Sequence, residues 1–445
     1  MTSKNLQDAI DQAGSPIRLL WKQNPPPWQP PVVPPEFSGW REEYLAAFDS
    51  VALSDLCHHM PDLVMEGPDA VRLLSENSAN DYDNFAVGQA KQFVATTDAG
   101  YIINDGILLR NEKEKFTLTA IPPVVSWMRF HAERGGYDVS VSYDPDSGTR
   151  GGGDPTLFRY QVQGPRALDL VEQVFGGPLP KTKFFHSTEV ELGGRRFRAL
   201  RHGMTGQPGY EFNGDWRDEK FVKQALLEAG EEFGLVQVGA MAYSLNEFES
   251  GWIPAPTPGI YSAPELTSYR EWLPALSFEA RNPLHGSFFS ENIEDFYTTP
   301  YELGYGKSIS FDHDFVGRDA LKKARDNVTQ KKVTLVLDRD QVRQVWSGPE
   351  LPFDVSYGRY RVEVDGRLIG VAFAGGAVPT VETMLYLTLV DTKYATPGTE
   401  VTFVWGEHPG PGISPDADLG FSRIKATVQP SPYNEYTRTG YRDKD

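Results

Sequence analysis

The segment RHGMTGQPGYE, residues 201–211, decides the fold that we predict for this chain. The strand-like residues 187–203, STEVELGGRRFRALRHG, run into it, and the helical sequence KFVKQALLEAGEEFG follows at 220–234. Upstream, residues 158–165 read as a strand and a turn, and residues 166–176, RALDLVEQVFG, read as a helix. Strands and helices that alternate in this way predict an α+β unit around the segment.

Three further segments stand in the same order as the motifs of a known family. They are GYIIND at 100–105, FDHDFVGRDAL at 311–321 and GVAFAGGAVPTVETMLYLTLVD at 370–391. Together with residues 201–211, they resemble the G-G-I-I-D-D, R-T-G-Y-T-G-E-x-G-x-E, K-x-D-F-x-G-x-E-A-L and G-x-V-T-S-G-x-x-S-P-x-L motifs of the glycine cleavage T protein (aminomethyltransferase) family. The resemblance implies an α+β, three-domain aminomethyltransferase fold around a central folate channel, with a mostly β C-terminal domain.

Other stretches are similar to one branch of that family, the tetrahydrofolate-dependent vanillate and syringate O-demethylases. The similar stretches are HHM (58–60), FHAERGGY (130–137), VGAMAYSLNEFESGWIPAP (238–256), YREWLPA (269–275) and GYGKSISFDHDFVGRDAL (304–321). The resemblance implies a methyltransferase that moves the methyl group of a methoxyarene to N5 of tetrahydrofolate and releases a phenol.

Composition limits the class of protein and of partner. The chain has 445 residues, a formal net charge of −18 and a single cysteine, Cys57. The acidic excess disfavours nucleic acid as a partner, because binding to phosphates depends on Lys and Arg. One cysteine cannot form an internal disulfide, and Cys and His are not spaced as in zinc sites. We therefore expect no metal. The sequence shows neither an apolar leader nor a membrane span, so we expect a cytoplasmic protein without a membrane partner.

Breaks in the sequence pattern suggest the domain limits. Residues 24–36 contain seven prolines, which predicts an extended arm, and an amphipathic helix is expected within residues 36–53. We predict four parts: the arm and the first part of a discontinuous folate-binding domain (1–60), a second α+β domain (61–153), the remainder of the folate-binding domain with a connecting segment (154–330), and a β-rich domain (331–445).

Tyr243 is the residue to which we assign the chemistry. Cleavage of an aryl methyl ether expels a phenoxide, which needs a proton or an environment that stabilises its charge. A tyrosine, with an ordinary pKa of about 10, matches a phenol leaving group. In the resembling demethylases the tyrosine at this position is the catalytic one. The alternative is an interior tyrosine whose hydroxyl only completes a hydrogen bond.

Three residues are expected to bind tetrahydrofolate. The resemblance places Glu211 on the glutamate that accepts a pair of hydrogen bonds from the pterin. It places Asp105 near the reacting folate nitrogens, although Asn104 replaces the first aspartate of the family motif, and it places Trp252 against the folate. The alternatives are a solvated glutamate at a strand end, an aspartate that caps an Asn-Asp-Gly turn and a core tryptophan.

The arene is expected to contact His59, Trp28 and Ile121. His59 matches the demethylases, but Ile121 replaces an arginine that can pair with a substrate carboxylate, and Pro30 replaces a tyrosine. A more apolar pocket favours a bulkier, halogenated or less polar methoxyarene, such as the chlorinated methoxybenzoate dicamba. The resemblance implies a methoxybenzoate-type arene that can also be lignin-derived, such as vanillate or syringate. We reject a metal site at His58 and His59, because neighbours on a strand point to opposite faces. A structural role for His59 is the alternative.

Two other functions stay open. A folate-binding scaffold without catalysis would use the same fold. An aminomethyltransferase or a sulfonium demethylase of this fold would act on a different donor. Met241 and Ala242 stand where aminomethyltransferases carry an arginine and an aspartate, which disfavours an aminomethyltransferase. A sulfonium donor would need an anionic or aromatic cage, which Ile121 does not supply.

Overall fold

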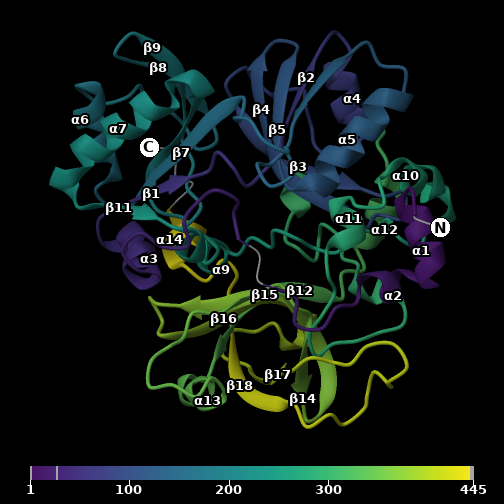
Figure 1. The fold of residues 1–445 in the computed structure, drawn as a ribbon. Helices are drawn as coiled ribbons and strands as arrows, with labels where there is room; N and C mark the ends of the chain where they lie inside the picture. The colour runs from purple at the N-terminus through teal and green to yellow at the C-terminus, as the bar shows by residue number, and fades with distance from the viewer. Residues whose placement is uncertain (1–2, 27–28, 441–445) are drawn as a thin grey trace.

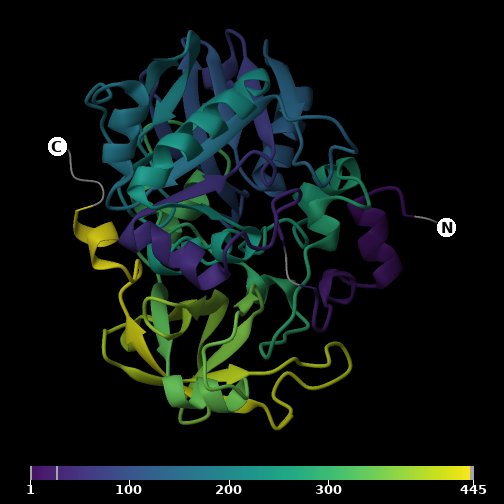
Figure 2. The same ribbon diagram turned by 60° about the vertical axis from the view of Figure 1, so that its left-hand side comes forward.

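A computed structural model of the protein describes residues 3–26 and 29–440. Its strands form three sheets, each in its own lobe of the molecule (Figure 1). The lobes of the first two sheets lie side by side, and the C-terminal lobe lies beneath both of them in this view. The C-terminal lobe also stays apart from the other two when the molecule is turned (Figure 2). The mixture of helices and sheets confirms the α+β prediction.

The first sheet joins parts of the chain that are far apart in sequence. Its strand order is β11 (Leu235–Val238), β1 (Val51–Asp55), β7 (Leu157–Gln163), β10 (Gly209–Asp215), β9 (Arg195–Leu200) and β8 (Ser187–Leu192). The helices α6 (Ala167–Phe175) and α7 (Glu219–Gly230) share a buried cluster with Tyr160, Val162 and Phe212. Because side chains alternate along a strand, Gln161 and Glu211 point away from this cluster.

The second sheet is continuous in sequence. Its strand order is β3 (Ala90–Thr96), β4 (Ile102–Glu112), β5 (Lys115–Thr119), β2 (Asp62–Glu66) and β6 (Ser140–Asp144). The helices α4 (Ala70–Glu76) and α5 (Pro122–Arg134) pack on it through Leu73, Trp127 and Met128. Residues 104–106 lie inside β4, so the Asn-Asp-Gly turn that we considered for them is wrong.

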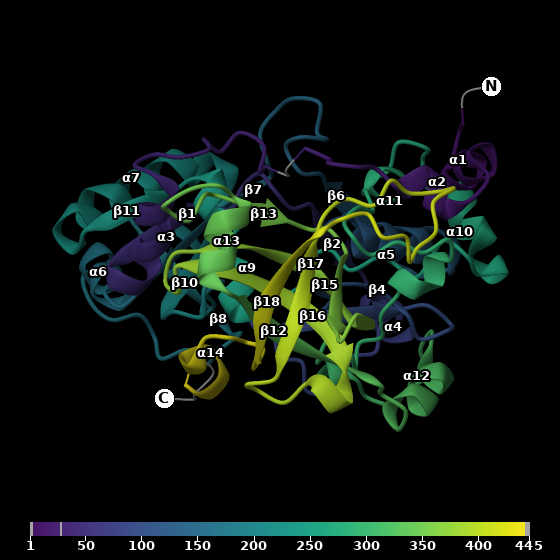
Figure 3. The same ribbon diagram turned by 90° about the horizontal axis from the view of Figure 1, so that it is seen from below.

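The third sheet closes into a barrel. Its order is β13 (Val355–Ser356), β15 (Arg367–Val378), β14 (Tyr360–Val364), β17 (Glu400–Trp405), β18 (Ser422–Gln429), β12 (Gln330–Leu337) and β16 (Thr383–Asp391), and β16 pairs back to β15. Its helix α13 (Arg339–Val345) adds Val342 to the barrel core. A tight turn joins β14 to β15, with Asp365 and Gly366 both at positive φ. Seen from below, the barrel lies in front, with α12 (Arg318–Arg325) and α14 (Glu435–Thr439) on opposite sides (Figure 3).

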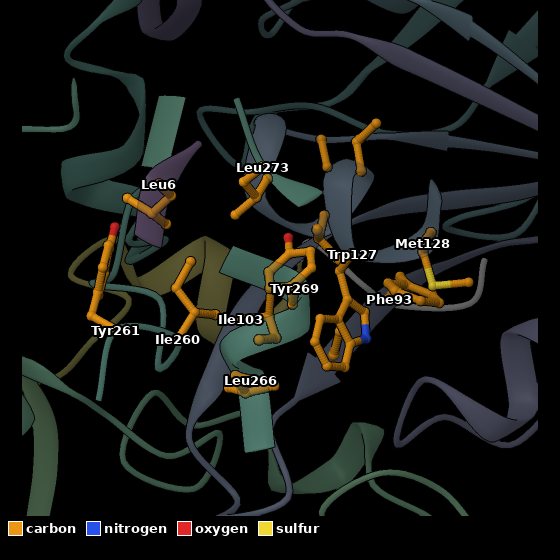
Figure 4. Packing of buried hydrophobic residues seen from close by; sticks show 14 of the residues in the cluster. Leu6, Phe93, Ile103, Trp127, Met128, Ile260, Tyr261, Leu266, Tyr269 and Leu273 are labelled. Carbon is orange, nitrogen blue, oxygen red and sulfur yellow. The ribbon is translucent and has the colours of Figure 1, made fainter. Parts of the chain in front are cut away.

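The N-terminal helices pack against segments that come much later in the sequence. The helices α1 (Leu6–Ala13) and α2 (Pro16–Leu20) lie beside α10 (Thr267–Trp272) and α11 (Phe278–Arg281). Figure 4 shows Leu6 in one packed group with Ile260, Leu273 and the Trp127 ring of α5. This cluster anchors the start of the chain, from which the proline arm continues.

Three short helices lie where the lobes meet. These are α3 (Trp40–Asp49), α8 (Ala240–Tyr243) and α9 (Asn246–Ser250). Tyr44, Tyr243 and Phe248 from these helices share a buried cluster with Leu385 of the barrel. The helix predicted within residues 36–53 is α3, and it is shorter than expected because Val51–Asp55 already belongs to β1. In the part of the chain that the structure describes, no helix combines the length and the apolar character needed to cross a membrane.

Candidate active site

Tyr243 and His59 form a close pair at the junction of the lobes. Tyr243 ends α8 and is 7% exposed, and its hydroxyl lies 2.7 Å from Nε2 of His59. The two rings meet edge to face, with centroids 4.9 Å apart. His59 lies in the bend between β1 and β2 that connects the first two sheets. The prediction that His58 and His59 occupy a strand is therefore wrong.

Both members of the pair are neutral near pH 7. Burial raises the pKa of Tyr243 well above its ordinary value, and the charges of Glu247 and Glu211 raise it further. Desolvation lowers the pKa of His59 to about 3, with a smaller effect from Arg159. A hydrogen bond to the Leu56 backbone opposes part of this decrease. A neutral imidazole carries its proton on one ring nitrogen only, so the tautomer of His59 decides whether Nε2 accepts from the Tyr243 hydroxyl or donates to it.

A row of polar side chains crosses the first sheet. The strand register sets Ser54 beside Gln161 and Gln161 beside Glu211, so all three face the same side. Ser54 Oγ and Gln161 Nε2 are buried and have no hydrogen-bond partner among residues 3–26 and 29–440. Buried polar atoms are normally paired, so an unpaired group marks a place where a ligand or solvent molecule can bind.

Arg159 joins the first two sheets through buried ion pairs. Its Nε lies 3.0 Å from Glu211 Oε1, and its Nη2 lies 3.0 Å from Asp62 Oδ1 of β2. Nη2 also donates to Thr119 Oγ1 at 3.1 Å. Burial raises the pKa of Glu211, and the charge of Arg159 opposes the increase. Glu211 is thus neither solvated nor isolated, and Arg159, which the sequence analysis missed, orients it. The alternation of Arg159, Gln161 and Gln163 with apolar and aromatic residues in β7 was the available signal.

Asp105 and Trp252 are in direct contact. Trp252 Nε1 donates to Asp105 Oδ2 at 3.1 Å, and Gln92 Nε2 donates to the same oxygen at 2.7 Å. Burial raises the pKa of Asp105 to about 6, although both hydrogen bonds lower it. The register of β4 with β5, and of β5 with β2, places Asp105 on the same face of the second sheet as Thr119 and Asp62. Asp105 therefore belongs to the wall that Arg159 contacts.

The residues predicted to contact the arene are only partly described. Ile121 is the N-cap residue of α5. The N–H of the residue before it, Ala120, donates to the Pro61 carbonyl at 3.4 Å. Ile121 therefore lies beside the bend that carries His59. Trp28 falls outside the described residues. The His58 ring turns to Ser147 Oγ at 2.8 Å, and in the described ranges no group of three His, Cys, Asp or Glu side chains is arranged to hold a metal ion.

Glu247 and Tyr357 complete the surroundings of Tyr243. Glu247 is buried on α9, and the Tyr357 hydroxyl donates to its Oε1 at 2.6 Å. Burial raises the pKa of Glu247 to about 8. Glu247 lies four positions after Tyr243, in the next helix, whereas Tyr357 comes from the barrel lobe.

Comparisons with known proteins agree on the relatives of this chain. The family model of the GCVT N-terminal domain matches residues 23–255. Syringate O-demethylase of Sphingobium sp. (strain NBRC 103272 / SYK-6) is 38% identical, over 99% of this chain and 98% of that protein. Sesamin methylene transferase of Sinomonas sp. (strain No.22) is 29% identical, over 90% of each. The crystal structure of glycine cleavage system aminomethyltransferase T from Bartonella henselae has a TM-score of 0.61, with 19% identity and 97% of each chain covered. The predicted aminomethyltransferase fold is therefore confirmed.

Proposed function

Since the chain belongs to the family of the GCVT N-terminal domain, we propose that it is a tetrahydrofolate-dependent methyltransferase that removes the methyl group of a methoxyarene. The observation that carries the proposal is the buried Tyr243–His59 pair, with hydroxyl and imidazole 2.7 Å apart. The 38% identity to a syringate O-demethylase over nearly the whole chain supports the same reaction. We place this reaction in the cytoplasm, with a small-molecule arene and tetrahydrofolate as the partners and neither nucleic acid nor a membrane involved.

Tyr243 serves the leaving oxygen of the arene. As the methyl–oxygen bond breaks, that oxygen becomes a phenoxide, and a hydroxyl placed beside it stabilises the developing charge. Tyr243 remains protonated at any working pH, because burial raises its pKa well above the ordinary value. For this role neutral His59 carries its proton on Nε2 and donates to the Tyr243 oxygen, so that the Tyr243 O–H is available for the leaving oxygen. The pair therefore presents a neutral, oriented donor.

The polar walls fit a pterin. Such a ring carries hydrogen-bond donors and acceptors along its edge, and the walls offer the carboxylates of Glu211 and Asp105 and the unpaired amide nitrogen of Gln161. Trp252, which donates to Asp105, would pack against the ring. When bound, tetrahydrofolate supplies the nitrogen that takes the methyl group. Asp105, a carboxylate above a pH of about 6, can accept the proton that N5 would lose, and the phenoxide would take up a proton in turn to leave as the phenol.

The arene pocket is apolar on the side of Ile121, which is unsuited to pairing with a substrate carboxylate. We propose a methoxybenzoate-type substrate, either chlorinated, such as dicamba, or lignin-derived, such as vanillate or syringate, that turns its ring substituents and not its carboxylate toward Ile121. An uncharged edge of this kind accepts a chlorine or a second methoxy group without leaving a polar group unpaired.

The test is incubation of the purified protein with tetrahydrofolate and each of these arenes. We expect 5-methyltetrahydrofolate and the matching phenol in equal amounts, detected by mass spectrometry. Formaldehyde released without folate would contradict the proposal. Folate binding without methyl transfer to any arene would favour the inactive scaffold. Transfer from an aminomethyl or sulfonium donor alone would favour the other activities of this fold.

A further inference from the structure

A buried glutamate binds two separate parts of the chain. Glu43 lies in the first turn of α3, and its side chain is fully buried. Its Oε1 accepts the N–H groups of Ser38 at 2.7 Å and Gly39 at 3.1 Å, and also that of Phe37. Its Oε2 accepts the N–H of Gly239 at 2.8 Å. One carboxylate thus connects the end of the proline arm to the residue that precedes α8.

The arm supplies the next two acceptors for α8. The N–H of Ala240 donates to the Pro34 carbonyl at 2.8 Å, and the N–H of Met241 donates to the Pro35 carbonyl at 3.0 Å. The first N–H groups of a helix have no partner within the helix and need acceptors from outside. Arm and helix also touch directly, because a Cβ on Gly239 would lie 2.5 Å from the Pro35 oxygen.

The helix held in this way is the one that carries Tyr243. It has four residues, and Tyr243 is the last of them. A helix of one turn has little stability of its own, so its neighbours determine where it lies. The N–H of Tyr243 donates to the Gly239 carbonyl at 3.0 Å. A displacement of Gly239 therefore moves Tyr243 relative to His59.

We propose that Glu43 is a positioning residue for Tyr243, because it binds the proline arm and the start of α8 to one carboxylate. The inference rests on the proposed role of Tyr243 in methyl transfer. A carboxylate suits the task, since its two oxygens accept several N–H groups at once and charge-assisted hydrogen bonds are strong. A glutamine of the same size has one acceptor oxygen and would turn an N–H toward one set of donors.

Hydrogen exchange on the full-length protein tests the contact without any turnover. In Glu43→Gln we expect the amides of residues 239–241 to exchange about 10-fold faster or more, the scale of losing a charge-assisted hydrogen bond. Glu42→Gln is the matched control, because Glu42 is the exposed neighbour and loses the same charge; its exchange should equal wild type. Unchanged exchange in Glu43→Gln would overturn the inference. If Glu43→Gln does not fold, Gly239→Ala takes its place, because its added Cβ would displace Pro35. Faster amide exchange at residues 240–241 would then support the inference, and unchanged exchange would overturn it.

A double-mutant cycle then tests whether Glu43 acts through Tyr243. We expect Glu43→Gln to lower kcat by about 10-fold with little change in KM, and to add less than about twofold in the Tyr243→Phe background. Losses that multiply would show that Glu43 only supports the fold. Absence of methyl transfer by the wild-type enzyme would contradict the proposed function instead, and the exchange rates would still decide on the contact between Glu43 and α8.

Discussion

Tyr243→Phe separates chemistry from packing. The substitution removes one oxygen, which lies 2.7 Å from His59 Nε2, and keeps the buried ring. Loss of a group that stabilises developing charge lowers kcat by about 10²–10³-fold, which corresponds to about 2.7–4 kcal/mol in the transition state. The lost hydrogen bond to His59 costs the folded state about 1–3 kcal/mol. We therefore expect a large fall in kcat, a nearly unchanged KM and a modest fall in Tm.

The assay is a single-turnover measurement of 5-methyltetrahydrofolate, with tetrahydrofolate and the arene saturating. Tyr269→Phe is the matched control, because Tyr269 is also buried but its hydroxyl only reaches the Pro123 carbonyl at 3.4 Å. The control should turn over like the wild type. A Tyr243→Phe enzyme with a wild-type single-turnover rate and a lowered Tm would refute the reasoning, and would reduce Tyr243 to a core residue.

Three further predictions follow from the carboxylates. Burial raises the pKa of Asp105 to about 6, so kcat/KM of the wild type should fall as pH drops below that value, and Asp105→Asn should be slow with no such limb between pH 5 and 8. Burial raises the pKa of Glu247 from 4.5 to about 8. The stability that its protonated form contributes is fully present below pH 4.5 and is lost as pH rises through 8. The Tm of the wild type should therefore fall with pH over this range more steeply than the Tm of Glu247→Gln. Glu211→Gln should weaken tetrahydrofolate binding by about 1.5–3 kcal/mol and leave the arene KM unchanged, as measured by titration of each substrate.

The sequence was sufficient for those features that depend on short-range pattern. The strand-like pattern of residues 187–203 predicted strands of the first sheet, and β8 and β9 lie within it. Tyr243 and His59 were both predicted as site residues, and the structure brings them together although 184 positions separate them. The predicted domain limits and the roles of the site residues stay predictions.

Contacts between distant elements could not be derived in this way. Arg159 binds Asp62 across two sheets, and Tyr357 reaches Glu247 from the barrel. A periodic pattern can show that a polar residue faces one side of a strand, but it cannot show which residue of another lobe is its partner. Each of these contacts depends on how the lobes pack and not on the spacing within one element. Glu43 was overlooked for a related reason: a glutamate in a first helical turn usually faces solvent, and only the three-dimensional arrangement shows it buried.

The polar row on the first sheet also restricts how this chain can change in length. Arg159 and Gln161 face the side of the polar row because Tyr160 and Val162 face the apolar core. Insertion or deletion of one residue within β7 would exchange the two sets and place a guanidinium in an apolar core. Residues 151–154, just before β7, are exposed and keep no such register. Gaps in an alignment of relatives should therefore collect at 151–154, whereas β7 should diverge by substitution alone.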